Sequence, residues 1–317
     1  MNNELVNYPP QQDYGVLPVG TTDDHLIEMW LVDTADNTKQ AYRLDIQQFR
    51  DFVQCPLQHL KLPVLQAFKG DLEDLGLAPN TRARKLKAVK SLLSFAKKTG
   101  YTQFNVGAMV KIPKSKNTLA ERILTEEQVI SMIVQEHNQR NHVLLRLLYA
   151  AGLRVSELCD LCWKDVHPRG EAGQITIFGK GEKTRHVLLK ESTYKELLKL
   201  RNDASNDDPV FRSRGGGRGK AGSKLDPSQA HRIVEAAAVR AGIETYQTTK
   251  RRKEIVVPVT RSYVSPHWLR HAHASHALDN GASIALVKET LGHESIETTS
   301  KYTHAHPDDS SARFLKI

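Results

Sequence analysis

Residues 110–125, VKIPKSKNTLAERILT, divide the chain into two parts that must fold separately. The stretch combines proline with basic and small polar residues, a composition typical of a linker. Directly after it, Thr125 and Gln128 have the spacing of a capping box, which predicts that a helix begins there. A chain of 317 residues has the length of about two domains. We therefore predict two domains joined by a linker over 113–124.

The part before the linker is predicted to be all-helical. Apolar residues recur at helical spacing over 42–53 and 64–75, and a third helix is predicted over 81–98. Because these segments are consecutive and amphipathic, they predict a small helical domain over 37–112. Residues 1–36 show little periodicity and are predicted to be a partly ordered extension.

The helix predicted over 81–98 carries seven Lys and Arg residues and no acidic residue. A solvated face would tolerate such a sequence, but a cationic run without acids favours contact with the phosphates of a nucleic acid. The net charge of +9 is consistent with a polyanionic partner. The predicted DNA contacts in this helix are Arg82, Arg84, Lys85, Lys87 and Lys90.

The part after the linker is predicted to mix helices with a small antiparallel sheet. It opens with helical segments, and residues 173–189 then alternate apolar and polar residues around a Gly-Lys-Gly turn, which predicts a hairpin with Lys180 at its tip. Residues 247–264 are basic and β-branched and predict a second hairpin or strand pair. Helices complete a domain over 125–305, which is followed by a tail over 306–317.

Two further segments are candidates for contact with DNA phosphates. The stretch 213–223, SRGGGRGKAGS, is predicted to be a flexible basic loop, and the second hairpin contains the run KRRK. Contacts of this kind position a protein on DNA without reading its sequence. The candidates are Arg214, Arg218, Lys220, Lys250, Arg251 and Arg252.

The three cysteines give no disulfide framework and indicate a reducing compartment. Cys159 and Cys162 form a CxxC pair, for which a redox or zinc role is the alternative to packing in the core. Core packing is favoured because the segment is predicted to be helical and no second ligand pair is nearby. No signal-peptide pattern or membrane-spanning apolar run is present in the sequence, so we expect a cytoplasmic protein that acts on the nucleoid.

The stretch SPHWLRHAHASHALDNG places four histidines and an arginine within ten residues. His267, Arg270 and His271 are spaced i, i+3 and i+4, so they share one helical face. A core would not accept these groups without partners, and we therefore expect an anion against this face. A zinc site is the alternative, because histidines four residues apart occur on metal-binding helices. The arginine would repel a cation, so no metal is predicted, and His273 and His276 receive no role.

Five short stretches follow one another in a characteristic order. They are AAGLRVSELCDL with Arg154 and Glu157, FGKGEKTRHV with Lys180, HWLRH, LGHESIETT with His293, and TSKYTH with Tyr302. Each stretch is a weak signal by itself. In this order the chain resembles the tyrosine recombinases, the family of phage integrases and Xer-like site-specific recombinases. The resemblance covers roughly 37–305 and is densest over 147–164 and 265–304.

The resemblance implies a fold, a partner and a set of active-site residues. The fold would be mainly α: a four-helix SAM-like core-binding domain plus a mixed α/β catalytic domain. The partner would be double-stranded DNA with specific recombination sites, on which the protein would act as a homo-tetramer without a cofactor. The catalytic residues would be Arg154, Lys180, His267, Arg270, His293 and Tyr302, accompanied by Glu157 and His271.

The residue types suit attack on a phosphodiester. Two guanidinium groups, those of Arg154 and Arg270, can stabilise the charge that develops on the non-bridging oxygens. Tyr302 can attack once its phenol proton is removed, and Lys180 can protonate the 5′-oxygen that leaves. The resemblance implies a 3′-phosphotyrosyl product, whose rejoining needs neither ATP nor metal.

Two other functions remain open from the sequence. A type IB topoisomerase has a similar catalytic set but relaxes supercoils alone, and the separate helical domain favours a recombinase. A non-catalytic DNA-binding regulator would not need the complete set. Compared with compact Xer-type chains, this chain has extra residues at 1–36 and a basic insertion at 247–264. These two departures suggest a mobile-element or specialised excision role.

Overall fold

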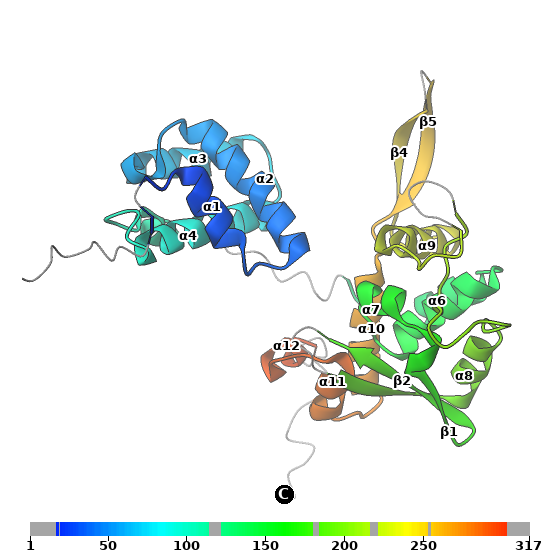
Figure 1. Cartoon of the computed structure of the whole chain (residues 1–317). Coiled ribbons are helices and arrows are strands. Elements are labelled where there is room, and N and C mark those ends of the chain that lie inside the picture. The colour runs from blue at the N-terminus through cyan, green and yellow to red at the C-terminus, as the bar shows by residue number, and fades with distance from the viewer. Residues whose placement is uncertain are drawn as a thin grey trace, which may run out of the picture. The chain divides into compact units, whose positions relative to one another are not determined.

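The computed structural model describes residues 17–18, 20–113, 122–179, 184–215, 221–252 and 255–302. The chain forms two compact units, Met1–Lys116 and Asn117–Ile317, which we call the first unit and the second unit and describe separately (Figure 1). Their boundary falls inside the linker predicted over 113–124. In the described part of the chain, no helix is both long and apolar enough to cross a membrane.

The first unit is helical throughout its described residues. Its elements are α1 (Asp23–Leu31), α2 (Asp36–Val53), η1 (Leu57–His59), α3 (Leu62–Asp74), α4 (Pro79–Lys98) and η2 (Val106–Met109). The four α-helices pack around one core, to which α2, α3 and α4 contribute Phe49, Phe68 and Leu92. The predicted four-helix domain is therefore confirmed, and α4 begins two residues before the predicted start at residue 81.

Helix α1 is the main difference from the sequence prediction in this unit. Leu26 and Leu31 are fully buried in the first unit's core, so the helical domain begins before residue 37. Thr22 caps the helix by accepting a hydrogen bond from the His25 backbone N–H. One short helix within a Pro- and Gly-containing segment gives too few turns to show a clear period, which is why the sequence did not reveal it.

The second unit combines helices with two small antiparallel sheets. Its helices are α5 (Glu126–Val134), α6 (Gln139–Ala150), α7 (Val155–Asp160), η4 (Trp163–Asp165), α8 (Glu191–Leu198), α9 (Pro227–Arg240), α10 (Pro266–Asp279), α11 (Ile284–Leu291) and α12 (Ile296–Ser300). Its strands are β1 (Val166–Arg169), β2 (Ala172–Phe178), β3 (Thr184–Leu189), β4 (Thr245–Arg252) and β5 (Ile255–Ser262). The predicted capping box of Thr125 and Gln128 starts α5, with both reciprocal hydrogen bonds formed.

Both predicted hairpins are present. Strands β1, β2 and β3 form one sheet, in which Ile175 pairs with Val187 and both side chains face the core. Strands β4 and β5 form a separate two-stranded sheet that pairs from Thr245 with Ser262 to Arg252 with Ile255. This hairpin extends well beyond the helices of the second unit (Figure 1).

Helix α10 carries the HWLRH motif. It packs against α5, α6, α9 and α11, and its Leu269 and Ala272 are buried in the main core. A smaller cluster of Ala274, Leu291 and Tyr302 joins α10 to α11 and to the segment after α12. The helix that carries the HWLRH motif is therefore held from several sides.

The cysteines of the CxxC pair differ in their surroundings. Cys159 is buried in α7, and burial raises the pKa of its thiol to about 12. Cys162 is half-buried at the N-cap of η4, where burial also raises the pKa of its thiol. The predicted packing in the core is confirmed for Cys159, whereas Cys162 is only partly buried.

Candidate active site

Arg270 occupies the interior of the second unit. Its side chain lies on α10 and the residue is 2% exposed. Two guanidinium N–H groups donate to the carbonyl oxygens of Gly152 and Leu291, each at 2.6 Å. Burial, reinforced by the nearby positive charge of Arg154, lowers the pKa of Arg270 to about 10, so it remains charged at neutral pH.

Gly152 is required where the chain passes Arg270. Its φ of +58° lies in the left-handed region, and an added Cβ would come within 2.5 Å of Leu291 Cδ2. The absence of a side chain at Gly152 thus lets α11 approach closely. This close approach brings the Gly152 carbonyl within reach of Arg270.

Arg154 is fixed at the start of α7 by Glu157. The Arg154 backbone N–H donates to one carboxylate oxygen of Glu157 at 2.8 Å, and its guanidinium donates to the other at 2.8 Å. A further guanidinium N–H donates to the Gly292 carbonyl at 3.3 Å. The side chain is 40% exposed, which leaves part of the guanidinium accessible to a ligand.

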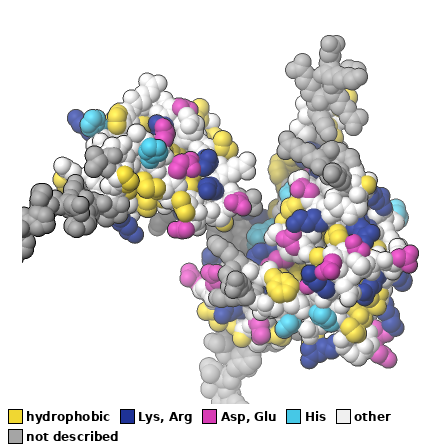
Figure 2. Space-filling model, in the orientation of Figure 1, with side chains coloured by type: hydrophobic (Ala, Val, Ile, Leu, Met, Phe, Trp, Pro, Cys, Tyr) yellow, Lys and Arg dark blue, Asp and Glu magenta, His cyan; other side chains and the backbone are white. Residues whose placement is uncertain are grey.

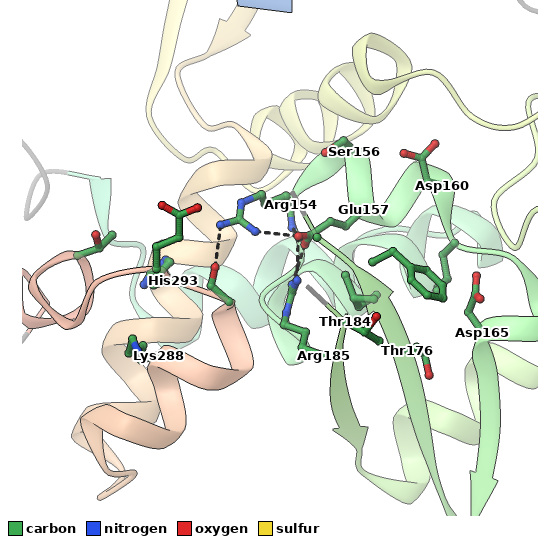
Figure 3. A pocket seen from close by; sticks show the side chains of 17 residues that line it. Arg154, Ser156, Glu157, Asp160, Asp165, Thr176, Thr184, Arg185, Lys288 and His293 are labelled. Carbon is green, nitrogen blue, oxygen red and sulfur yellow. Dashed lines mark hydrogen bonds and ion pairs between the residues drawn. The ribbon is translucent and has the colours of Figure 1, made fainter. Parts of the chain in front are cut away.

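Arg185 is a site residue that the sequence reasoning missed. It lies on β3, and its guanidinium forms a bidentate pair with Glu157 at 2.9 and 2.7 Å (Figure 3). Its Nε–H donates to the Thr290 carbonyl at 2.8 Å. The alternation of buried residues along β3 could have revealed it, because Arg185 falls on the same face as the apolar Val187 and Leu189.

Glu157 is ionised between these two arginines. Its carboxylate is 6% exposed, and burial by itself would raise its pKa. The hydrogen bonds from Arg185 and Arg154 outweigh burial and hold the pKa below its ordinary value. Figure 3 shows both guanidinium groups directed at this one carboxylate from different elements.

The C-terminal end of α11 brings the three arginines together. Arg185, Arg270 and Arg154 donate to the successive carbonyls of Thr290, Leu291 and Gly292. The last carbonyls of a helix lack intrahelical partners and carry partial negative charge, so they are natural acceptors for cations. Arginines that are far apart in the sequence therefore meet at one point of the fold.

Tyr302 lies beside this point and is the last described residue. It is 4% exposed, and its hydroxyl oxygen is 2.6 Å from Nδ1 of His271. Its ring is nearly parallel to that of His293, with centroids 6.5 Å apart. Burial raises the pKa of the Tyr302 phenol, and the positive charge of Arg270 partly opposes that rise.

The three histidines around Tyr302 are neutral at pH 7. Burial, together with neighbouring positive groups, lowers the pKa of His271 and of His293 to about 4 each. The pKa of His267 is lowered in the same way, and its ring packs edge-on against His271 with centroids 4.7 Å apart. The Nδ1 atom of His293 is 2.9 Å from the Thr299 hydroxyl, which fixes the orientation of the ring.

A cavity of about 700 Å³ lies beside the arginines, between the three-stranded sheet and the end of α11 (Figure 3). Arg154, Glu157 and His293 line it, together with Phe178 and Thr184. Phe178 ends β2 and Thr184 begins β3, so the turn that was predicted to carry the catalytic lysine joins two strand ends at this cavity. Lys180 itself lies outside the described residues.

The remaining two histidines of the motif are packing residues. Nδ1 of His273 is 2.8 Å from the Tyr149 carbonyl oxygen, and Nδ1 of His276 is 2.9 Å from the Tyr149 hydroxyl. Both contacts join α10 to α6, because Tyr149 belongs to α6. The structure thus divides the histidine run into a site group and a structural group.

Neighbouring helices supply acidic partners to the basic helix α4, whose own sequence lacks them. Asp45 of α2, which is 1% exposed, pairs with Arg84 and Lys85. Glu73 of α3 pairs with Arg82. The Val110 carbonyl oxygen accepts a hydrogen bond from the Lys90 ammonium group. The cations with these partners are Arg82, Arg84, Lys85 and Lys90. Lys87 is exposed, and no partner contacts it among the described residues.

Only Arg214 of the other predicted DNA contacts has a described side chain. It lines an open groove at the start of α9 together with Arg140 and Arg232. Arg218 and Lys220 lie outside the described residues, as do the side chains of Lys250, Arg251 and Arg252 on β4. On the face seen in Figure 2, basic and acidic side chains are interspersed on both units and do not form one basic patch.

The helical first unit, the mixed second unit, and the convergence of arginines, histidines and a buried tyrosine define a tyrosine recombinase. The phage integrase family model matches residues 122–308, and the model for the phage integrase N-terminal SAM-like domain matches residues 26–100. The chain belongs to the phage integrase family and is an enzyme of the tyrosine recombinase class. The SAM-like match begins inside α1, in agreement with the place of α1 in the first unit's core.

Individual relatives agree with this assignment. The chain is 32% identical over 276 residues to a protein named tyrosine recombinase XerC from Corynebacterium glutamicum, covering 84% of this chain and 81% of the relative. It is 27% identical over 286 residues to tyrosine recombinase XerD from Staphylococcus epidermidis, covering 85% and 88%.

Solved structures share the fold. A lambda integrase dimer bound to a COC′ core site superposes with a TM-score of 0.67 at 17% identity, covering 94% of this chain and 80% of that chain. The XerH recombinase bound to its difH substrate in a pre-cleavage complex superposes with a TM-score of 0.62 at 23% identity, covering 88% and 77%.

Proposed function

We propose that the chain cleaves and rejoins double-stranded DNA at specific sites through a 3′-phosphotyrosyl bond to Tyr302, without ATP or a metal. One observation carries the proposal. Arg154, Arg270 and Tyr302 come from separate elements, and the structure gathers them around the end of α11. A phosphate held there would face two arginines and the phenolic oxygen together.

The arginines would stabilise the transition state. Attack by the Tyr302 oxygen gives a five-coordinate phosphorus with added negative charge on the non-bridging oxygens. Arg154 and Arg270 are held in place by backbone carbonyls and Glu157, so they need little reorganisation when that charge develops. Removal of one such preorganised donor typically costs about 100-fold or more in rate.

The leaving 5′-oxygen needs a proton, and Lys180 is the proposed donor. The described residues on either side of it, Phe178 of β2 and Thr184 of β3, line the cavity beside Arg154. The phosphotyrosyl bond would retain the energy of the broken phosphodiester. Rejoining to a different 5′-hydroxyl would then need no external energy source.

Strand exchange is proposed to occur in a homo-tetramer that holds two DNA sites and passes through a Holliday junction. Recombinases with this fold have been solved in complex with DNA, which supports DNA as the partner of this chain. Of the predicted DNA contacts, Lys87 and Arg214 are proposed to contact phosphates, because Lys87 is exposed with no partner among the described residues and Arg214 lines a groove with Arg140 and Arg232. Their contacts would position the enzyme on the duplex.

A trapping experiment tests the proposal. The DNA that co-purifies with the protein would be sequenced to find its site, and a nicked suicide duplex carrying that site would be incubated with the full chain. A covalent protein–DNA adduct is expected with the wild type and not with Tyr302→Phe, which should still bind the duplex. Adduct formation by Tyr302→Phe, or none by the wild type, would refute the proposal.

Further assays on the same protein distinguish the proposed recombinase from the two other functions considered from the sequence. A recombinase should exchange strands between two cognate sites, whereas a type IB topoisomerase should relax a supercoiled plasmid that lacks those sites. A DNA-binding regulator should shift the duplex in a gel without forming an adduct.

A further inference from the structure

In the described part of the chain, the Tyr302 hydroxyl makes one hydrogen bond, and its partner is His271. The distance from its hydroxyl oxygen to Nδ1 of His271 is 2.6 Å, and the two ring centroids are 5.6 Å apart. His267, one turn earlier on α10, contacts the His271 ring and makes no described hydrogen bond with Tyr302. Within the described residues, the group in contact with the attacking oxygen is therefore the last histidine of HWLRH.

We infer that His271 is the catalytic group that accepts the Tyr302 phenolic proton when DNA is cleaved. The inference rests on the proposed function and gives one residue of that site a specific task. It changes the expectation from the sequence, in which His271 faced the anion together with His267 and Arg270. In the structure its Nδ1 faces the nucleophile.

The proton can be followed through the reaction. In cleavage, the Tyr302 O–H bond breaks, its proton moves to His271 Nδ1, and the phenolic oxygen forms a bond to phosphorus as the 5′-oxygen leaves with a proton from the proposed donor, Lys180. In rejoining, the 5′-hydroxyl returns that proton to the lysine as it attacks phosphorus, and the imidazolium returns its proton to the departing phenolic oxygen. The group thus holds one proton between the two steps, and no other reactant is needed.

Bound phosphate would strengthen this acceptor. His271 faces His267 and Arg270 on its own helix, Arg122 before α5, His293 after α11, and Tyr302. Burial and these positive or protonatable groups keep the imidazole neutral in the free protein, with a pKa of about 4. A phosphate on Arg270 and Arg154 adds negative charge beside them, which favours the imidazolium. Tyr302 would then be activated mainly when DNA occupies the site.

An acceptor that cannot be protonated distinguishes proton transfer from simple positioning. Asparagine can place its side-chain oxygen near the position of His271 Nδ1, so His271→Asn can keep the hydrogen bond with Tyr302 but cannot take its proton. His276→Asn is a matched control, because His276 makes the same kind of contact with the Tyr149 hydroxyl, 2.9 Å away and outside the site. Single-turnover cleavage of the nicked duplex would be measured from pH 5 to pH 9.

The expected result is that His271→Asn cleaves about 100-fold or more slowly than the wild type, since general bases typically contribute at least that factor. The wild-type rate should fall at acidic pH as the acceptor is protonated, and His271→Asn should lose this dependence. His276→Asn should cleave at close to the wild-type rate. Wild-type cleavage by His271→Asn, or an unchanged pH profile, would overturn the inference.

A change in the nucleophile gives a second readout. Replacement of Tyr302 by a fluorinated tyrosine lowers the pKa of the phenol from its ordinary value of about 10 and weakens the need for a proton acceptor. When both proteins carry the fluorinated tyrosine, the difference in cleavage rate between the protein with His271 and the His271→Asn variant should shrink. An unchanged difference would mean that His271 only positions the ring. If the wild type formed no adduct at all, the proposed function would fail before this comparison could be made.

Discussion

Replacing Arg185 by methionine should destabilise the second unit strongly. Arg185 and Glu157 form a bidentate pair in which the two side chains are only 9% and 6% exposed. Removing one partner of a buried pair typically costs about 3–5 kcal/mol, because the other charge is left without compensation. Arg154 still contacts Glu157, which places the expected loss near the lower end, at roughly 3 kcal/mol. Loss of the donor to the Thr290 carbonyl adds about 1 kcal/mol.

Urea unfolding followed by tryptophan fluorescence measures this loss. Of the three tryptophans, only Trp30 lies in the first unit, so Trp30→Phe gives a background in which fluorescence reports the second unit. Lys164→Met is the matched control, since Lys164 pairs with Asp207 at an exposed surface and its removal should cause no resolvable change. An Arg185→Met loss as small as that of the control would refute the reasoning.

The pH dependence of stability tests the same variant in a second way. The pKa of Glu157 is held below its ordinary value in the folded protein, so its contribution is present above the unfolded pKa of about 4.3 and is lost as pH falls through the folded value. In Arg185→Met, burial should raise the pKa of Glu157 because its main partner is missing. The difference from the wild type should therefore shrink toward pH 4, and a constant difference would contradict this account.

Three other outcomes are expected. Gly152→Ala should lower the stability of the second unit by at least about 2 kcal/mol, because the residue has a positive φ and its Cβ would clash with Leu291; a smaller loss in urea unfolding would show that α11 shifts easily. Lys87→Ala should weaken DNA binding and reduce the slope of log affinity against log salt by about 1, with unchanged unfolding. Arg84→Ala should in addition destabilise the first unit, because the buried Asp45 keeps only Lys85; circular dichroism melts check this.

Local patterns predicted the parts of the fold that depend on neighbouring residues. The capping box at Thr125 and both hairpins are set by residues a few positions apart, and all three are present. The spacing of His267, Arg270 and His271 also placed them on one helix. In contrast, α1 is short, and its burial depends on α2, α3 and α4, which its own nine residues do not reveal.

The partners of the charged and titratable groups depend on tertiary contacts, which the spacing of residues in the sequence does not reveal. Arg185 reads as an ordinary strand residue until the fold shows it beside Glu157 and the end of α11. Helix α4 looked free of acids because Asp45 and Glu73 lie on other helices. The role of His271 likewise depends on the position of Tyr302, which is 31 residues further along the chain.

The site is electrostatically incomplete without an anion. Three guanidinium groups, those of Arg154, Arg185 and Arg270, meet at the end of α11, and Glu157 is the one carboxylate that bridges any of them in the described structure, which leaves two positive charges in excess. Burial lowers the pKa of Arg270, and the positive charge of Arg154 beside it lowers that pKa further. A phosphate at this point would relieve the repulsion, so duplex DNA should stabilise the second unit against unfolding. At 100 times the dissociation constant, the gain is about 2.7 kcal/mol. Arg154→Gln should lose most of it, because the Arg154 side chain is far more exposed to a ligand than those of Arg185 and Arg270.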